Sequence, residues 1–176
     1  MDAQAYLELL DARYSVRSFS EQQLSDDELA VVLAAAQKSP SAKNTQPWRF
    51  CVVQSAEGIA NIDECTPCRY GAPTVIICAY DKEQSVSDLG YETGYFGDID
   101  TSIAITNMTN AAAAAGLGSC WVGRFEPAAV RERFNVPETY VLVELLMLGH
   151  PAEDAAPAPR HEATLPLETL VVHESF

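Results

Sequence analysis

The sequence predicts an α+β fold in which helices cover both faces of a mixed sheet. Helix-like and strand-like hydrophobic patterns alternate along the chain, but the strands are separated irregularly, which favours α+β over a regular βα repeat. Thr74–Tyr80 and Tyr140–Leu148 are apolar on both faces and are therefore expected in the centre of the sheet. Asp98–Ala115 has no clean polar face, so it is expected to be the most buried helix.

The N-terminal elements are predicted from apolar spacing and capping residues. Residues 3–12 form an amphipathic pattern, and residues 13–19 alternate too strictly for a helix. Ser25 stands three residues before Glu28, which is the spacing of a capping box. The helix that it opens is expected to end near Ser39, because a proline follows.

The remaining elements follow the same two periodicities. They are expected, in chain order, as a strand at Arg49–Gln54, a short helix at 55–65, a strand at Thr74–Tyr80, a loop at 81–97, a helix at Asp98–Ala115 capped by Gly116, a strand at Ser119–Gly123, a helix with Pro127 in its first turn, and a strand at Tyr140–Leu148. From Pro151 the chain becomes a stiff, proline-rich connector. It ends in an apolar tail, which suggests docking on a second subunit.

Length, composition and charge narrow the class of protein. The 176 residues fit one domain, and 48% hydrophobic with 20% charged residues is a globular composition. A formal net charge of -14 argues against nucleic acids and anionic membranes as partners, because both are polyanions. The acidic start does not resemble a signal peptide, no apolar run reaches about 20 residues, and the five cysteines show no disulfide spacing. We therefore expect a cytoplasmic protein.

Several common chemical motifs are absent from the sequence. It contains neither a GxGxxG dinucleotide fingerprint nor a GxxxxGK[ST] phosphate loop. Cys65 and Cys68 form a single CxxC pair without the further ligands that a structural zinc site needs, so no metal site is expected. The three histidines are scattered and predict no nucleophile–histidine arrangement.

Two segments do gather groups that could bind an anionic or polar ligand. Arg13, Ser15 and Arg17 alternate, so an extended backbone would project them to one side as an anion clamp. Ordinary surface arginines would give the same pattern. Ser39–Phe50 (SPSAKNTQPWRF) is a polar stretch stiffened by two prolines, which fits either a ligand-binding loop or a solvated turn.

Five segments, in this order and spacing, resemble the nitroreductase family of FMN-dependent, NAD(P)H-oxidising enzymes. They are RYSVRSF, SPSAKNTQPWRF, the helix entering AAAAAGLGSCWVG, the LGHPAE turn and the PAPR tail. The resemblance covers nearly the whole chain. It implies a single FMN-binding domain over 1–176, built as an α/β/α sandwich with a mixed, largely antiparallel sheet. It also implies an intertwined homodimer with FMN at the interface and the tail, 151–176, docked on the partner subunit.

The resemblance also assigns residues to the cofactor. Arg13 and Ser15 match residues at the phosphate and ribityl end, and Arg17 matches a cation at the N1–C2 edge of the flavin. Arg160 matches a tail cation that closes on the phosphate, and His161 stands where a second basic residue is common. The full set implied to bind FMN is Arg13, Tyr14, Ser15, Arg17, Pro40, Ser41, Ala42, Asn44, Gln46, Trp121, Val122, Gly123 and Arg160.

Two of these segments have particular expected positions. Ser41, Asn44 and Gln46 are expected to reach the flavin held mainly by the other subunit. The backbone of Trp121–Gly123 is expected to lie over the ring. No catalytic residue is expected in the chain, since the cofactor carries the chemistry. A further polar contact to the flavin pyrimidine is expected before the Thr74–Tyr80 strand, from either Asn61 or Thr66.

The implied activity is a ping-pong reaction. NADH or NADPH would reduce FMN, and a nitroaromatic, quinone or similar flat acceptor would then reoxidise it. Alternatives within the fold are reductive dehalogenation, flavin fragmentation and azoline oxidation; a non-catalytic flavin-binding redox protein and a structural dimer are further alternatives. The 81–97 segment is short for the family, so Tyr91, Tyr95 and Phe96 are expected to line a more open pocket or to anchor the loop on the core.

Overall fold

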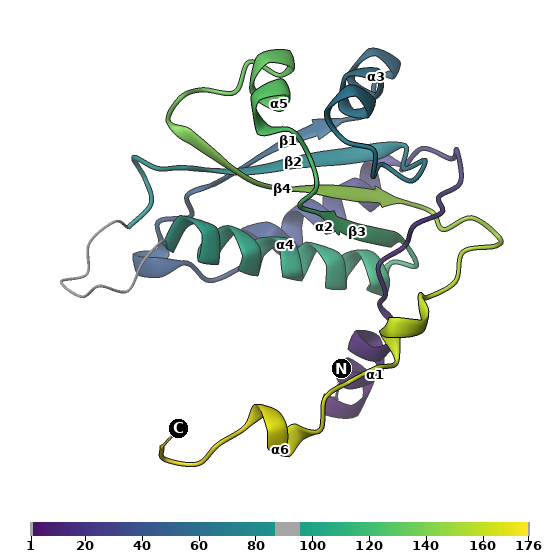
Figure 1. Cartoon of the computed structure of the whole chain (residues 1–176), viewed down its shortest axis with the longest axis vertical. Helices are drawn as coiled ribbons and strands as arrows, with labels where there is room; N and C mark the ends of the chain where they lie inside the picture. Colours follow the sequence, from purple (N-terminus) through teal and green to yellow (C-terminus); the bar gives the residue numbers. More distant parts are fainter. Residues whose placement is uncertain (1, 87–95, 176) are drawn as a thin grey trace.

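A four-stranded antiparallel sheet forms the centre of the molecule (Figure 1). The structure is a computed structural model, and it describes residues 2–86 and 96–175. The strand order is β1-β2-β4-β3. The strands are β1 (Trp48–Val53), β2 (Thr74–Asp81), β3 (Gly118–Val122) and β4 (Tyr140–Gly149).

The hydrophobic patterns predict which strands are central. All eight residues of β2 are buried, and β2 pairs with β1 on one side and β4 on the other. The last five residues of β4 are also buried. All pairs among the four strands are antiparallel, and a single isolated parallel bridge joins Ser15 to Ser119, so the N-terminal segment lies beside β3.

Helices cover both faces of this sheet, as expected. α2 (Asp26–Gln37) and α4 (Phe96–Ala114) lie on one face, whereas α3 (Ala56–Cys65) and α5 (Pro127–Arg133) lie on the other (Figure 1). Each face has its own buried cluster. Ile76, Leu146 and Met108 belong to the first cluster, and Ile77 and Leu145 belong to the second. Successive residues of a strand therefore point into different cores.

Helix termini agree with the capping signals in the sequence. The Ser25 hydroxyl accepts from the Glu28 N–H, and the Glu28 carboxylate accepts from the Ser25 N–H, which completes the capping box of α2. Gly116 follows α4 with φ 74°, a backbone conformation that glycine adopts without steric cost. The Leu117 N–H then donates to the Ala112 carbonyl at 2.8 Å, which closes the helix end.

The two ends of the chain project together from the body of the molecule (Figure 1). α1 (Ala3–Ala12) has no buried residue, and neither η2 (Pro159–His161) nor α6 (Leu167–Leu170) has one. The tail carries large apolar side chains that are 44–71% exposed, namely Leu165, Leu167, Leu170, Val171 and Val172. An exposed apolar surface of this kind is typical of a protein–protein interface.

Differences from the predicted elements are small. α4 begins at Phe96, two residues before the expected start, and the short helices η1 (Ala42–Asn44), η2 and α6 were not predicted. Tyr91 and Tyr95 lie outside the described residues. Within residues 2–86 and 96–175, no helix has the length and apolar character needed to cross a lipid bilayer.

Candidate functional site

The N-terminal segment 13–19 is fixed along the edge strand β3. The Val16 N–H donates to the Ser119 carbonyl at 3.0 Å, and the Val16 and Phe19 side chains are buried. Because side chains alternate along an extended backbone, burial of Val16 leaves Ser15 and Arg17 on the outer side. The sequence predicted this placement for both residues.

A hollow of about 480 Å³ brings this segment together with the start of the tail. The residues that line it are Tyr14, Ser15, Arg17, Ala158, Arg160 and His161. We call it the cationic hollow, because two guanidiniums and an imidazole meet there in a chain of formal net charge -14. Guanidinium groups match the geometry of phosphate oxygens, so this hollow is suited to an anionic phosphate-bearing ligand.

His161 ties the two walls of the cationic hollow to each other. Its Nε2 lies 2.9 Å from the backbone oxygen of Asp11, and its ring meets the Tyr14 ring edge to face at 6.1 Å between centroids. The tail is therefore held against the N-terminal segment within one chain. This contact of His161 has no local sequence signal, since 147 positions separate it from Tyr14 along the chain.

Arg13 lies apart from the other predicted clamp residues. It lines a neighbouring hollow with Leu9, Val16 and Leu117, whereas Ser15 and Arg17 share the cationic hollow. The reason is local: Arg13 caps α1 and its N–H donates to the Leu9 carbonyl, so the alternating run starts after it. In the single chain, Arg13 therefore does not line the cationic hollow that Ser15 and Arg17 share.

The end of β3 is the second predicted part of the site. Trp121 is 37% exposed, Val122 is buried, and Gly123 follows the strand directly. A Cβ placed on Gly123 would lie 3.2 Å from Oε1 of Glu144, so the carboxyl group fills the space that a side chain would need. Glycine at this position lets the β4 carboxyl group approach the backbone of the predicted ring-contacting segment.

Glu144 is an acidic residue that the sequence left without a partner. It stands opposite Cys78 in the sheet, and among the described residues its Oε2 is buried without a hydrogen-bond partner. Burial raises the pKa of the Glu144 carboxyl above its ordinary value, because the charged form loses hydration. The pKa of the neighbouring Cys78 thiol is also raised, first by burial and then by the Glu144 charge.

The polar loop after α2 has an unusual backbone. Lys43, Asn44 and Gln46 all have positive φ, at 51°, 55° and 49°. Non-glycine residues rarely adopt this conformation, and it persists where the surroundings enforce it. The Gln46 N–H donates to the Ser41 hydroxyl at 2.9 Å, and the Ala42 N–H donates to Oδ1 of Asp100 at 3.0 Å. Pro40 is exposed at the start of this loop.

A single chain does not bring this loop to the cationic hollow. Ala42 is bonded to Asp100 in the first turns of α4, whereas Arg13 contacts the hollow that Ala113 and Gly116 line at the other end. Thirteen helical residues separate Asp100 from Ala113, which corresponds to about 20 Å along the axis. The predicted cofactor residues therefore form two groups at opposite ends of α4.

Neither residue expected to contact the flavin pyrimidine lines the cationic hollow. The Asn61 amide oxygen accepts from Arg133, and the Thr66 hydroxyl donates to the Arg124 carbonyl at 2.6 Å. Tyr70 is the residue of this region that interacts with Arg17, and it has a positive φ of 57°. The pKa of the Tyr70 hydroxyl is raised, chiefly by its hydrogen bond with Cys68, whereas its hydrogen bond with Arg17 lowers it. A Tyr-Gly pair before a strand signals only a turn, so the sequence did not identify it.

Comparison with known proteins decides the family. The family model described as "Nitroreductase family" matches residues 10–66 and 67–150. This chain belongs to the nitroreductase family. The resemblance in the sequence and the α/β/α arrangement are thereby confirmed, and the cationic hollow joins residues 14–17, within the matched range, to tail residues 158–161, beyond it.

Two relatives of this chain support its assignment to the nitroreductase family. A protein of Archaeoglobus fulgidus, provisionally named NADH dehydrogenase/NAD(P)H nitroreductase, is 31% identical over 84% of this chain and 86% of its own length. The FMN reductase [NAD(P)H] of Bacillus subtilis is 28% identical over 92% of this chain and 70% of its own length.

Solved structures of the family share the fold. The crystal structure of a nitroreductase family protein from Clostridium difficile 630 is 32% identical and superposes with a TM-score of 0.89, covering 97% of this chain and 98% of that one. A nitroreductase-like protein of Exiguobacterium sibiricum, solved in complex with FMN, superposes with a TM-score of 0.82 at 22% identity, covering 99% of each chain. At 22% identity, the superposition on the second structure shows a shared fold and nothing more.

We predict that Glu144→Gln changes stability in a pH-dependent way. The pKa of Glu144 is raised in the folded state, so ionisation costs folding free energy as pH rises from the ordinary glutamate value through the folded value. Glutamine avoids this cost. The variant should therefore gain more stability over the parent protein at pH 8 than at pH 4.5, measured by urea unfolding.

The exposed Glu138→Gln substitution is the matched control and should change stability equally at both pH values. A Glu144→Gln effect that is the same at pH 4.5 and pH 8 would contradict the pKa direction.

Proposed function

We propose that the chain is an FMN-dependent oxidoreductase that uses NADH or NADPH to reduce nitroaromatics, quinones or related flat acceptors. The observation that carries the proposal is the cationic hollow, which gathers Arg17, Arg160 and His161 in a strongly acidic chain of the nitroreductase family. The names of relatives, NAD(P)H nitroreductase and FMN reductase, agree with it.

The residues of the cationic hollow suit the phosphate end of FMN. The Ser15 hydroxyl can donate to a phosphate oxygen, and the Arg160 guanidinium can bind two oxygens at once. Tyr14 and Ala158 supply the apolar part of the wall. Arg13 lines the neighbouring hollow, which shares Tyr14 with the cationic hollow. Its assignment to the phosphate end requires its side chain to turn toward Tyr14.

Arg17 and the end of β3 suit the ring end. Arg17 is exposed, and its Nη1 donates to the Ser15 carbonyl at 3.3 Å, which orients the guanidinium. Bound FMN would supply the hydride chemistry, accepting from the nicotinamide and giving to the acceptor. Arg17 then fixes a positive charge where a reduced flavin gathers negative charge, and Trp121 and Gly123 provide the surface against which the ring is oriented.

A homodimer completes the site in this proposal. The polar loop with Ser41, Asn44 and Gln46 is fastened near the start of α4, and none of these residues lines the cationic hollow of its own chain, so they suit the flavin of a partner subunit. The tail offers the apolar surface for such an interface, because five of its large apolar side chains are exposed. One interface would then bury the tail and bring the two groups of cofactor residues together.

The direct test is the visible spectrum of the purified protein. It should be yellow, release FMN on denaturation, and lose its visible absorbance when NADH or NADPH is added without oxygen. A nitroaromatic or quinone should then restore the absorbance. A protein that neither binds FMN nor is bleached by either nucleotide would contradict the proposed function.

Arg17→Ala should slow reduction of bound flavin by at least about tenfold while weakening FMN affinity less, because its charge acts at the ring rather than at the phosphate. Stopped-flow reduction and fluorescence titration with FMN measure the two effects. Arg133→Ala is the matched control, since Arg133 pairs with Glu64 on the surface of α3 and α5 and lines no part of the cationic hollow. Equal reduction rates in the Arg17 variant and the parent would refute its role.

Removal of residues 164–176 should convert the dimer to a monomer and weaken FMN binding, although Arg160 and His161 remain. The triple change Leu167→Ser, Leu170→Ser and Val172→Ser should do the same, because it removes apolar surface without shortening the chain. Light scattering after gel filtration gives the mass. Glu168→Gln in the same short helix is the control, and a truncated protein that remains a dimer would show that the tail is dispensable.

A further inference from the structure

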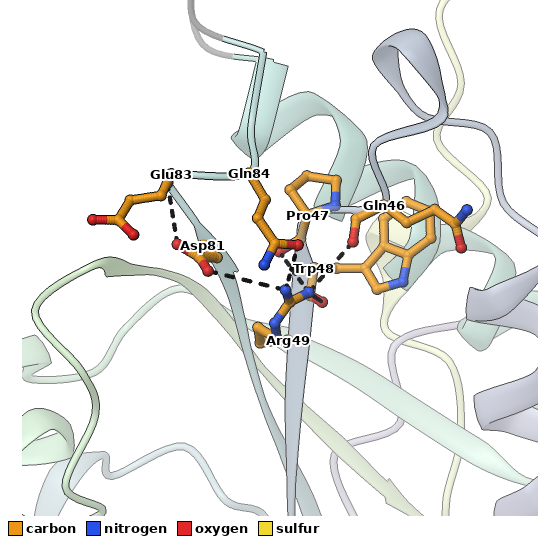
Figure 2. Close-up of polar contacts among 7 residues, drawn as sticks. All are labelled: Gln46, Pro47, Trp48, Arg49, Asp81, Glu83 and Gln84. Atoms are coloured by element: carbon orange, nitrogen blue, oxygen red, sulfur yellow. Dashed lines mark hydrogen bonds and ion pairs between the residues drawn. The ribbon is translucent and has the colours of Figure 1, made fainter.

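Arg49, in β1, binds the end of the polar loop through its guanidinium. Its Nη1 lies 3.4, 3.3 and 2.7 Å from the backbone oxygens of Gln46, Pro47 and Trp48. Its Nη2 donates to the side-chain oxygen of Gln84 at 2.6 Å. Figure 2 shows the guanidinium between these carbonyls on one side and the residues that follow β2 on the other.

These bonds are not an ordinary surface ion pair. The nearest carboxylate oxygen, on Asp81, is 4.0 Å from Nη2, whereas the carbonyl and amide contacts are as short as 2.6 Å. Asp81 itself accepts from the Glu83 N–H and is 8% exposed, so it also holds the turn that presents Gln84. The guanidinium therefore acts chiefly as a multiple donor to backbone oxygens and an amide.

The bound carbonyls belong to the part of the loop that is held in an uncommon conformation. Gln46 has φ 49° without being glycine, and its carbonyl is one that Arg49 binds. The Pro47 carbonyl also accepts from the Asp81 N–H at 2.9 Å, which joins the loop to β2 a second time. A left-handed residue keeps its conformation where neighbouring bonds over-determine it, and Arg49 supplies such bonds.

The loop is thus anchored at both ends and open in the middle. Asp100 of α4 accepts from the Ala42 N–H at the start, and Arg49 donates to the Gln46 carbonyl at the end. Between the anchors, the Asn44 and Gln46 side chains are exposed and bond each other at 3.2 Å. These two amides are therefore presented on a fixed backbone before any ligand binds.

We propose that Arg49 is a positioning residue of the FMN site, acting on the flavin held mainly by the partner subunit. Arg49 fixes the backbone of residues 46–48, and this keeps the Asn44 and Gln46 amides in the orientation in which they meet the cofactor. Gln84 holds the guanidinium in place from the other side. The proposal rests on the proposed function and adds a residue from outside the set assigned to the cofactor.

Lysine is a poor substitute for arginine at this position. A guanidinium carries five N–H donors on a planar frame, so Arg49 serves three carbonyls and Gln84 simultaneously. An ammonium group has one nitrogen and cannot lie near both sets of acceptors. Arg49→Lys should therefore restore only part of what Arg49→Met removes.

The experiment measures FMN affinity of the full-length apoprotein by quenching of flavin fluorescence. Arg49→Met should raise the dissociation constant for FMN at least tenfold, and the constant of Arg49→Lys should lie between those of the parent and Arg49→Met. The visible circular dichroism of bound flavin should change in both variants. Hydrogen exchange should rise in residues 41–48 of the apoprotein, since the loop loses its second anchor.

Gln84→Ala tests the other side of the clamp and serves if Arg49→Met does not fold. Alone it should weaken FMN binding less than Arg49→Met does. In the Arg49→Met background it should have no further effect, because Gln84 acts through Arg49. Additive losses in this double-mutant cycle would contradict the proposed route.

Arg131→Met is the matched control. Arg131 also donates to two backbone oxygens, those of Pro137 and Tyr140, but it lies on α5 and does not contact the polar loop. The Arg131→Met variant should have a lower melting temperature than the parent, and its FMN affinity should change by no more than twofold. An Arg49→Met protein that binds FMN like the parent would overturn the inference, as would equal losses in both variants. Failure of the parent itself to bind FMN would overturn the proposed function.

Discussion

The packing of α4 against the sheet is the constraint on which the rest of the molecule depends. Ala104, Ile105, Met108 and Ala112 are fully buried against α2 and the strands. A helix buried over this length cannot rotate or slide without opening a cavity, so both of its ends are fixed in space. Asp100 at one end fastens the polar loop, and the turn after Ala114 at the other end leads directly into β3. The polar loop and the N-terminal segment, which carry predicted cofactor residues, are therefore held apart by a rigid helix.

Electrostatics explains why the cationic hollow stands out in this protein. Eleven basic residues face twenty-five acidic ones, so an arginine in this chain has many more acidic than basic neighbours available to it. Arg69 and Arg133 pair with acids, whereas Arg17 and Arg160 line the hollow, and no ion pair within the described residues includes either. Cations that remain unpaired in an acidic chain keep their attraction for an external anion, and a negative surface elsewhere disfavours polyanions. Selectivity for a small anionic ligand follows from that contrast.

The sequence predicted the core well because buried apolar residues recur at the regular spacing of a helix or a strand. The apolar runs that became β2 and β4, the capping box at Ser25 and the long apolar helix all appear at their expected places, within two residues. It predicted the site less well because a site depends on bonds between distant residues. The contact of His161 with Asp11, the displacement of Arg13 by the end of α1 and the carbonyl clamp of Arg49 have no local pattern. The left-handed backbone at Lys43, Asn44 and Gln46 was also hidden, since none of these positions is glycine.

The proposed homodimer accounts for both the exposed apolar tail and the divided site. A single chain leaves Leu167 71% exposed, and its loop amides do not line its own cationic hollow. In the proposed dimer, burying the tail on a second copy would stabilise the assembly, and the same step would bring loop and hollow together. In the proposed dimer, folding, assembly and cofactor binding would be coupled, because FMN would bind the assembled state and shift the equilibrium toward it. A loop that is rigid before assembly suits this arrangement, since little conformational entropy remains to be lost when the cofactor binds.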